Sequence, residues 1–194
     1  MGLETKKLYE YRKANGYDEY FRGRGIDIGC GGHKNGNAMD LLTGFDYTEE
    51  VTPYDKSDGD ANTCSNIEDN TYDFVYSSHC LEHMKDATKA FSNWVRICKP
   101  HGYLVHAVPH ELFYEKCRWP SRYNKDHKWS WTLEFPSNLP KSIHVPDFLK
   151  QFSVDVIRLE TILLNFDFTR FQEDQTRENN GWAASHIEFV LRKH

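Results

Sequence analysis

The sequence predicts an α/β fold with a mostly parallel sheet, and three features support this prediction. Residues 25–32 place two isoleucines directly before a glycine-rich run, as in a buried strand that ends in a tight turn. Residues 87–98 repeat apolar side chains at helical spacing behind a potential N-cap, Asp86. This helix lies between apolar runs at 74–76 and 103–108. A strand, a helix and a second strand in this order form a right-handed parallel unit.

The first sixty residues are predicted to contain a helix and three strands. Residues 1–21 are expected to form a helical leader that is broken near Asn15-Gly16. The first strand then leads into the glycine-rich run. The second strand has two candidates, 38–42 and 43–47, each with one aspartate. A polar third strand is expected at 54–58.

The second half of the chain is predicted to complete the sheet. The aromatic stretch 109–144 is expected to be an insertion that covers the substrate. A short helix with proline in its first turn follows at 145–152. The apolar runs at 154–162 and 185–191 predict an antiparallel hairpin. Residues 1–194 are therefore expected to form one domain, a three-layer sandwich with a seven-stranded sheet.

Composition excludes several functional classes. The net charge is −5 and no basic run is visible, which argues against nucleic acid as a partner. The five cysteines are odd in number and scattered, so a reduced, cytoplasmic protein is expected. The sequence contains neither a signal peptide nor a long apolar span, so no membrane partner is expected. A homodimer remains open.

The glycine-rich turn indicates a nucleotide-sized site at the end of the first strand. The dinucleotide pattern G-x-G-x-x-G, counted from Gly29, fails at Lys34. The turn is instead accompanied by carboxylates, namely Asp27, Asp40, Asp46 and Asp60. Carboxylates repel a pyrophosphate but suit a ligand with an ammonium group, a sulfonium and ribose hydroxyls. This chemistry fits S-adenosylmethionine, and a simple tight turn is the alternative.

Four motifs occur in the order and at the spacing of a known family. They are Asp27-Ile28-Gly29-Cys30-Gly31, Gly59-Asp60-Ala61, the strand and loop at 72–83, and Lys99-Pro100-His101-Gly102-Tyr103-Leu104. Together they resemble the class I S-adenosylmethionine-dependent methyltransferases. The resemblance implies a Rossmann-like fold and S-adenosyl-L-methionine as cofactor. His33 and His101 depart from the family pattern, which has glycine at these positions in many members.

The resemblance also implies which residues bind the cofactor. They are Asp27, Gly29, Cys30, Gly31, Asp46, Asp60, Ala61, Ser77 and His79. A carboxylate at the end of the second strand is expected to accept hydrogen bonds from both ribose hydroxyls. We favour Asp46 for this role, and Asp40 is the alternative. Asp60 is expected to face the adenine amino group.

Three histidines are predicted to lie where a methyl acceptor enters, namely His79, His110 and His127. The ordinary pKa of a histidine side chain, about 6.5, suits a base that takes a proton from a hydroxyl or an amine. His110 is preferred because it follows the fifth strand directly. His83 is interpreted as structural. No metal site is expected, because no H-E-x-x-H pattern occurs and His79 is expected to precede the helix.

The sequence therefore predicts O- or N-methylation of a small-molecule or glycan acceptor. A glycan suits the aromatic stretch 109–144, because aromatic faces pack on sugar rings. Two alternatives stay open: a cofactor-binding module without catalysis, and an enzyme that uses the same cofactor for another reaction. A nicotinamide oxidoreductase is disfavoured by Lys34, and a nucleic-acid methyltransferase by the lack of a basic surface.

Overall fold

The computed structural model describes residues 2–31, 42–176 and 183–194. Within these residues the main sheet has six strands in the order β2-β1-β3-β4-β8-β7. The strands are β1 (Gly23–Ile28), β2 (Thr48–Tyr54), β3 (Tyr72–Ser78), β4 (Cys98–Pro109), β7 (Val154–Leu164) and β8 (Ala184–Lys193). The first four are parallel, whereas β8 runs antiparallel to both β4 and β7. The predicted α/β fold with an antiparallel C-terminal pair is confirmed.

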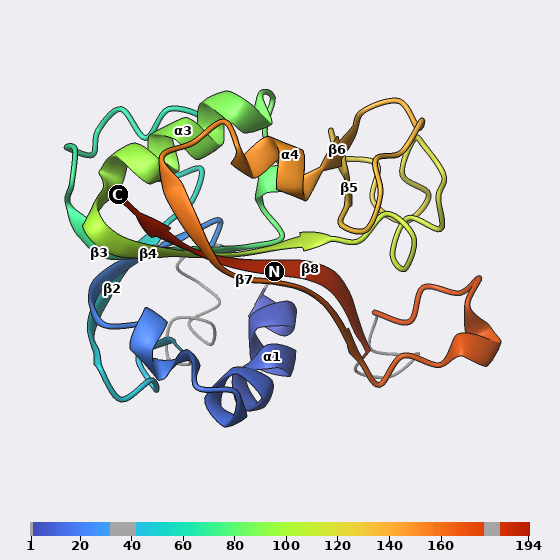
Figure 1. Cartoon of the computed structure of the whole chain (residues 1–194), viewed down its shortest axis with the longest axis horizontal. Helices are drawn as coiled ribbons and strands as arrows, with labels where there is room; N and C mark the ends of the chain where they lie inside the picture. The colour runs from blue at the N-terminus through green and yellow to red at the C-terminus, as the bar shows by residue number, and fades with distance from the viewer. Residues whose placement is uncertain (1, 32–41, 177–182) are drawn as a thin grey trace.

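Helices cover both faces of this sheet. They are α1 (Gly2–Ala14), α3 (Ala87–Ile97) and α4 (Val145–Leu149), with the 3-10 turns η1 (Tyr17–Tyr20), η3 (Leu81–His83) and η4 (Phe168–Arg170). Figure 1 shows α3 and α4 on one face and α1 on the other, which gives three layers. A two-stranded sheet of β5 (Ser130–Thr132) and β6 (Ser142–His144) lies beyond α4. None of the described helices is long and apolar enough to cross a membrane.

Helix α3 forms where its sequence pattern predicts a helix. The carboxylate of Asp86 accepts the backbone N–H of Lys89 at 2.9 Å and so caps the first turn. The buried face consists of Ala87, Ala90, Phe91, Trp94 and Ile97. Full burial of a side chain as large as Phe91 contributes roughly 1.5–3 kcal/mol. Docking of this face, more than helix propensity, therefore stabilises α3.

The predictions for the second and third strands are wrong. The second strand is β2, which begins at Thr48, after both candidate stretches; residues 38–41 lie outside the described part of the chain. Residues 55–58 form a turn, so the described sheet has six strands and not seven. β2 is an edge strand, which tolerates its proline and its exposed acidic residues. An irregular stretch, 55–71, thus connects β2 to β3 directly.

Helix α1 is tied to the sheet by a buried ion pair. Arg12 Nη2 lies 2.7 Å from Glu188 Oε2 on β8, and Arg12 Nε lies 3.0 Å from Glu188 Oε1. Arg12 Nη1 also donates to the Tyr76 hydroxyl on β3 at 2.9 Å. α1 ends at Ala14, just before Gly16 with a φ of 74°, so the predicted helix break is confirmed. The first residues therefore pack against the face of the sheet opposite α3.

Candidate functional site

A cavity of about 550 Å³ opens at the carboxyl ends of β1, β2 and β3. Gly29 after β1, Asp55 after β2 and Cys80 after β3 all line it. The rest of the wall comes from the turn after Asp55, from the residues that follow Cys80, and from residues 126 and 128 before β5. This edge of a parallel sheet is where α/β folds bind ligands, and the volume suits a nucleotide-sized molecule.

The backbone of the glycine-rich turn takes conformations that favour glycine. Gly29 and Gly31 have φ values of 81° and 86°, in the left-handed region that costs other residues energy. The turn is fixed to the end of β2 by two hydrogen bonds. Gly29 N donates to the Tyr54 carbonyl at 2.8 Å, and Gly31 N donates to Asp55 Oδ2 at 2.8 Å. Backbone can therefore approach a ligand closely at this point.

The acid at the end of the second strand is Asp55. Its side chain is half-buried, lines the cavity and is oriented by the backbone N–H groups of Gly31 and Lys56. Asp46, which we favoured, lies before β2 rather than after it, and its exposed carboxylate pairs with Lys13 at 2.9 Å. That choice is corrected, because the strand register was misplaced. Asp40 lies outside the described residues.

The turn that follows Asp55 forms one wall of the cavity. Asp60 and Ala61 line it, as the motif implied. Asn62 donates to Asp60 Oδ1 from its side-chain amide at 2.7 Å and from its backbone N–H at 2.9 Å, and these hydrogen bonds hold the pKa of the carboxyl below its usual value. Helix α3 holds the wall from behind: Trp94 Nε1 donates to the Ala61 carbonyl at 2.8 Å, and Arg96 donates to carbonyls further along.

Besides Asp46, five residues expected at the cofactor do not line the cavity, namely Asp27, Cys30, Gly31, Ser77 and His79. Asp27 and Ser77 point into the fold from β1 and β3 and are almost fully buried. Burial raises the pKa of Asp27 to about 7, although the charge of Arg12 opposes this shift. His79 is largely buried, with a φ of 54°, and its ring contacts His186.

His110, the preferred catalytic base, does not line the cavity. Its Nδ1 accepts the Leu112 backbone N–H at 3.1 Å, and its Nε2 lies 3.2 Å from Glu134 Oε2. Both ring nitrogens are therefore engaged, in a buried position that lowers the pKa of the ring. This arrangement fixes the start of the insertion after β4 and contradicts a position for His110 at the reacting groups.

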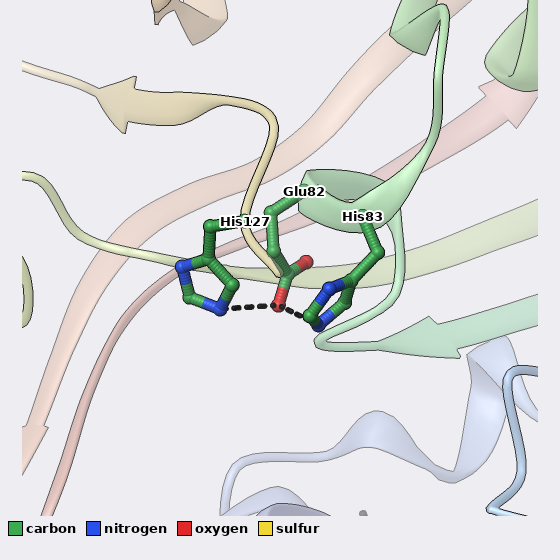
Figure 2. Close-up of side chains that lie close together, drawn as sticks. All are labelled: Glu82, His83 and His127. Atoms are coloured by element: carbon green, nitrogen blue, oxygen red, sulfur yellow. Dashed lines mark ion pairs between the residues drawn. The ribbon is translucent and has the colours of Figure 1, made fainter. Parts of the chain in front are cut away.

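Two histidines converge instead on Glu82 beside the cavity. Figure 2 shows Glu82 between His83, its neighbour in η3, and His127, which comes from the chain between β4 and β5. Glu82 Oε1 lies 3.8 Å from Nε2 of each histidine. His83 lines the cavity, and the pKa of its ring is lowered to about 4, chiefly by burial. The backbone N–H groups of residues 128 and 129 donate to the Glu82 carbonyl and hold the two segments together.

Sequence reasoning missed Asp55 and gave His83 no functional role. Asp55 could have been found because the short run that contains Val51 and Tyr54 ends directly at this acid. Lys85 and Lys128 also line the cavity. No local pattern marks these lysines, because only the docking of the insertion on η3 brings them to the same opening.

The sequence and the fold were compared with known proteins. Residues 26–106 match the family model described as a methyltransferase domain. No curated protein sequence matches this chain.

Solved structures share the fold at low sequence identity. One is a "putative sarcosine dimethylglycine methyltransferase" from Galdieria sulphuraria, with a TM-score of 0.61 and 16% identity, covering 96% of this chain and 85% of that one. A second belongs to the Haloferax volcanii complex of the Trm112 methyltransferase activator with a "putative methyltransferase". It has a TM-score of 0.61 and 16% identity and covers 100% of this chain and 93% of that one. A third is an S-adenosylmethionine-dependent methyltransferase from Mesorhizobium loti, with a TM-score of 0.56 and 13% identity, covering 98% of this chain and 100% of that one. Residues 26–106 therefore resemble the methyltransferase-domain family, and the chain has the class I methyltransferase fold that its motifs predicted.

Proposed function

We propose that the protein transfers a methyl group from S-adenosyl-L-methionine to an oxygen or nitrogen of a small-molecule or glycan acceptor. The observation that carries this proposal is the cavity at the ends of β1, β2 and β3, with Asp55 and the Gly29–Gly31 turn at its edge. The family match over residues 26–106 supports the reaction type.

Asp55 is proposed as the ribose carboxylate. Each of its oxygens accepts one backbone N–H, from Gly31 and from Lys56, which fixes the carboxylate in place. An ionised carboxylate offers about four acceptor positions, so two remain for the vicinal ribose hydroxyls. Asp60 and Ala61 are proposed to contact the adenine, since they form the adjoining wall. Asp27 is proposed to act from beneath, as a buried carboxyl near the positive end of the cofactor.

The acceptor is proposed to enter between η3 and the insertion 109–144. This side of the cavity carries His83, Lys85, Asp126 and Lys128. Its residues come from the stretch predicted to cover the substrate and from the loop after β3. We propose His127 and His83, rather than His110 or His79, as the histidines that act near the acceptor. A cytoplasmic location and a homodimer stay predictions.

The first experiment is calorimetric titration with S-adenosylmethionine and with its demethylated product. Asp55→Ala should weaken binding about 30- to 150-fold, because charge-assisted hydrogen bonds to the ribose, worth roughly 2–3 kcal/mol in total, are lost. Asp46→Ala is the matched control and should bind as the wild type does. No binding by the folded wild type, or a loss in Asp46→Ala alone, would contradict the proposal.

A second experiment separates the alternatives. Wild-type protein is incubated with labelled cofactor and a panel of hydroxyl- and amine-bearing sugars and small molecules. Label in an acceptor supports methyl transfer. Binding without any turnover indicates a module without catalysis, and cofactor breakdown without an acceptor indicates a different reaction.

A further inference from the structure

Three potential metal ligands come together at the edge of the cavity. The Glu82 carboxylate and the rings of His83 and His127 place ligand atoms within 4.8 Å of one another, as Figure 2 shows. Ligands on a tetrahedral ion with bonds of 2.0–2.2 Å lie about 3.4 Å apart. The two Glu82–histidine distances of 3.8 Å therefore need to shorten by only about 0.4 Å to fit.

Glu82 itself points to a missing cation. Its side chain is 0% exposed, and within the described residues neither carboxylate oxygen has a hydrogen-bond partner. A buried carboxylate without a donor or a counter-ion is costly, and buried polar groups in proteins are nearly always satisfied. Imidazole nitrogens of His79, His83 and His127 lie 3.7–3.8 Å from Glu82 Oε1, and those of His83 and His127 are placed to ligate the same ion.

A second carboxylate orients His127. Its Nδ1 lies 2.6 Å from Glu115 Oε1, and Ser121 donates its hydroxyl hydrogen to Glu115 Oε2 at 2.5 Å. Because Nδ1 donates to Glu115, the lone pair of Nε2 is directed toward Glu82 and His83. A carboxylate on the far nitrogen is the usual companion of a metal-bound histidine, since it fixes the ring and makes the ligating nitrogen more basic.

We propose that Glu82, His83 and His127 bind one divalent transition-metal ion. Two imidazoles and one carboxylate suit Zn²⁺, Mn²⁺ or Fe²⁺, and three protein ligands leave at least one position for another molecule. The sequence did not predict this site, because His127 lies forty-four residues after His83 and reaches Glu82 only when the insertion docks on η3.

The ion also gives the acceptor chemistry a physical basis, and this step rests on the proposed function. His83 lines the cavity, so an acceptor hydroxyl there can take the open coordination position. Coordination lowers the pKa of the hydroxyl, whose proton passes to solvent. The oxygen lone pair then forms the new bond to the methyl carbon while the carbon–sulfur bond breaks. The sulfur keeps that electron pair and becomes a neutral thioether.

The test is direct titration of tag-free, chelator-treated protein with ZnCl₂ and, separately, MnCl₂. One ion per chain is expected, with a Kd for Zn²⁺ below about 1 µM. His127→Ala and Glu82→Gln should each weaken binding at least 100-fold, and Glu115→Gln about 10- to 100-fold. His144→Ala is the matched control, because His144 also pairs with a carboxylate, Asp147 at 2.8 Å, but lies outside the group.

Variants of the buried ligands could fail to fold, so His83→Ala provides a second route. The His83 side chain is 25% exposed, and circular dichroism should show a wild-type fold while binding is lost. Wild-type protein with Co²⁺ should show a ligand-field spectrum that disappears in the same variant. No binding by the wild type, or binding by His83→Ala and His127→Ala as tight as that of the wild type, would overturn the proposal.

Cofactor titration in the presence of chelator separates this proposal from the proposed function. Binding of S-adenosylmethionine without any metal binding would refute the metal site alone. Metal binding without cofactor binding would refute the proposed function and leave the site in place.

Discussion

Replacing Arg12 by methionine should destabilise the protein more than any surface change of similar size. Arg12 makes a bidentate pair with Glu188 and a hydrogen bond to Tyr76, and both charged side chains are 1% or less exposed. Methionine keeps most of the volume of the arginine but leaves Glu188 as a buried charge whose main partner is gone. The perturbation therefore tests electrostatics rather than packing.

The magnitude follows from the ionisation of Glu188. Burial opposes its charged form most strongly, but the charge of Arg12 and the hydrogen bonds from His186 and Arg12 together outweigh burial and lower the pKa from 4.5 to about 2. A shift of this size is worth about 3 kcal/mol, which is present above pH 4.5 and is lost as the pH falls through 2. Breaking a buried pair on one side costs about 3–5 kcal/mol. Since the free energy of unfolding of a domain is about 5–15 kcal/mol, the loss is a large fraction of the total.

The assay is urea unfolding of Arg12→Met, Glu188→Met and the double variant. Each single change should cost about 3–5 kcal/mol, whereas the double variant should cost less than either, because no buried charge is left unpaired. Arg24→Met is the control: its pair with Glu50 is more than half exposed and should contribute under about 1 kcal/mol. Additive single costs, or a loss under about 1 kcal/mol for Arg12→Met, would refute the reasoning.

Three further changes test other parts of the fold. The pKa of Asp27 is raised by burial to about 7, so the unfolded state ionises first and the wild type should lose up to about 4 kcal/mol of stability between pH 4 and 7. Asp27→Asn should flatten this fall in urea titrations across pH; an unchanged slope would contradict the shift. The pKa of His106 is lowered by burial to about 3, so acid should destabilise the wild type below pH 6.5, and His106→Leu should reduce that sensitivity in thermal scans at pH 4 and 7. A Cβ at Gly25 would lie 2.0 Å from the Phe74 ring, so Gly25→Ala should cost roughly 1–3 kcal/mol. Gly16→Ala meets no atom within 4 Å, so its cost comes only from the left-handed φ of 74°. A loss under about 1 kcal/mol in Gly25→Ala would contradict the predicted clash.

Most of the fold could be predicted from hydrophobic patterning. Helix α3 and strands β1, β3, β4, β7 and β8 occur where apolar periodicity or alternation predicted them. β2 was misplaced, because an edge strand with acidic residues and Pro53 lacks the continuous apolar run of a buried strand. The third strand predicted at 54–58 does not form, because a run this polar has too few apolar side chains to pack in a sheet.

The site could be predicted only where it depends on local sequence. Gly29, Asp60 and Ala61 belong to short motifs and line the cavity as expected. Asp55 was not identified because the second strand was predicted to end before β2 begins. Which histidine lies at the reacting groups could not be predicted, because each role depends on the partners that the insertion brings to that histidine. Glu134 engages His110 away from the cavity, whereas Glu115 turns His127 toward Glu82.

The way α3 holds the cavity wall has a consequence for how this protein can vary. The side chains of Trp94 and Arg96 donate to main-chain carbonyls of residues 61, 64 and 67, and Arg96 also pairs with one side chain of the same stretch, Asp69. Every amino acid supplies a main-chain carbonyl, so the wall keeps these main-chain hydrogen bonds when its side chains change. Selection on the shape of the wall should therefore act on a helix some thirty residues downstream, while wall positions other than the proposed cofactor contacts can change their side chains.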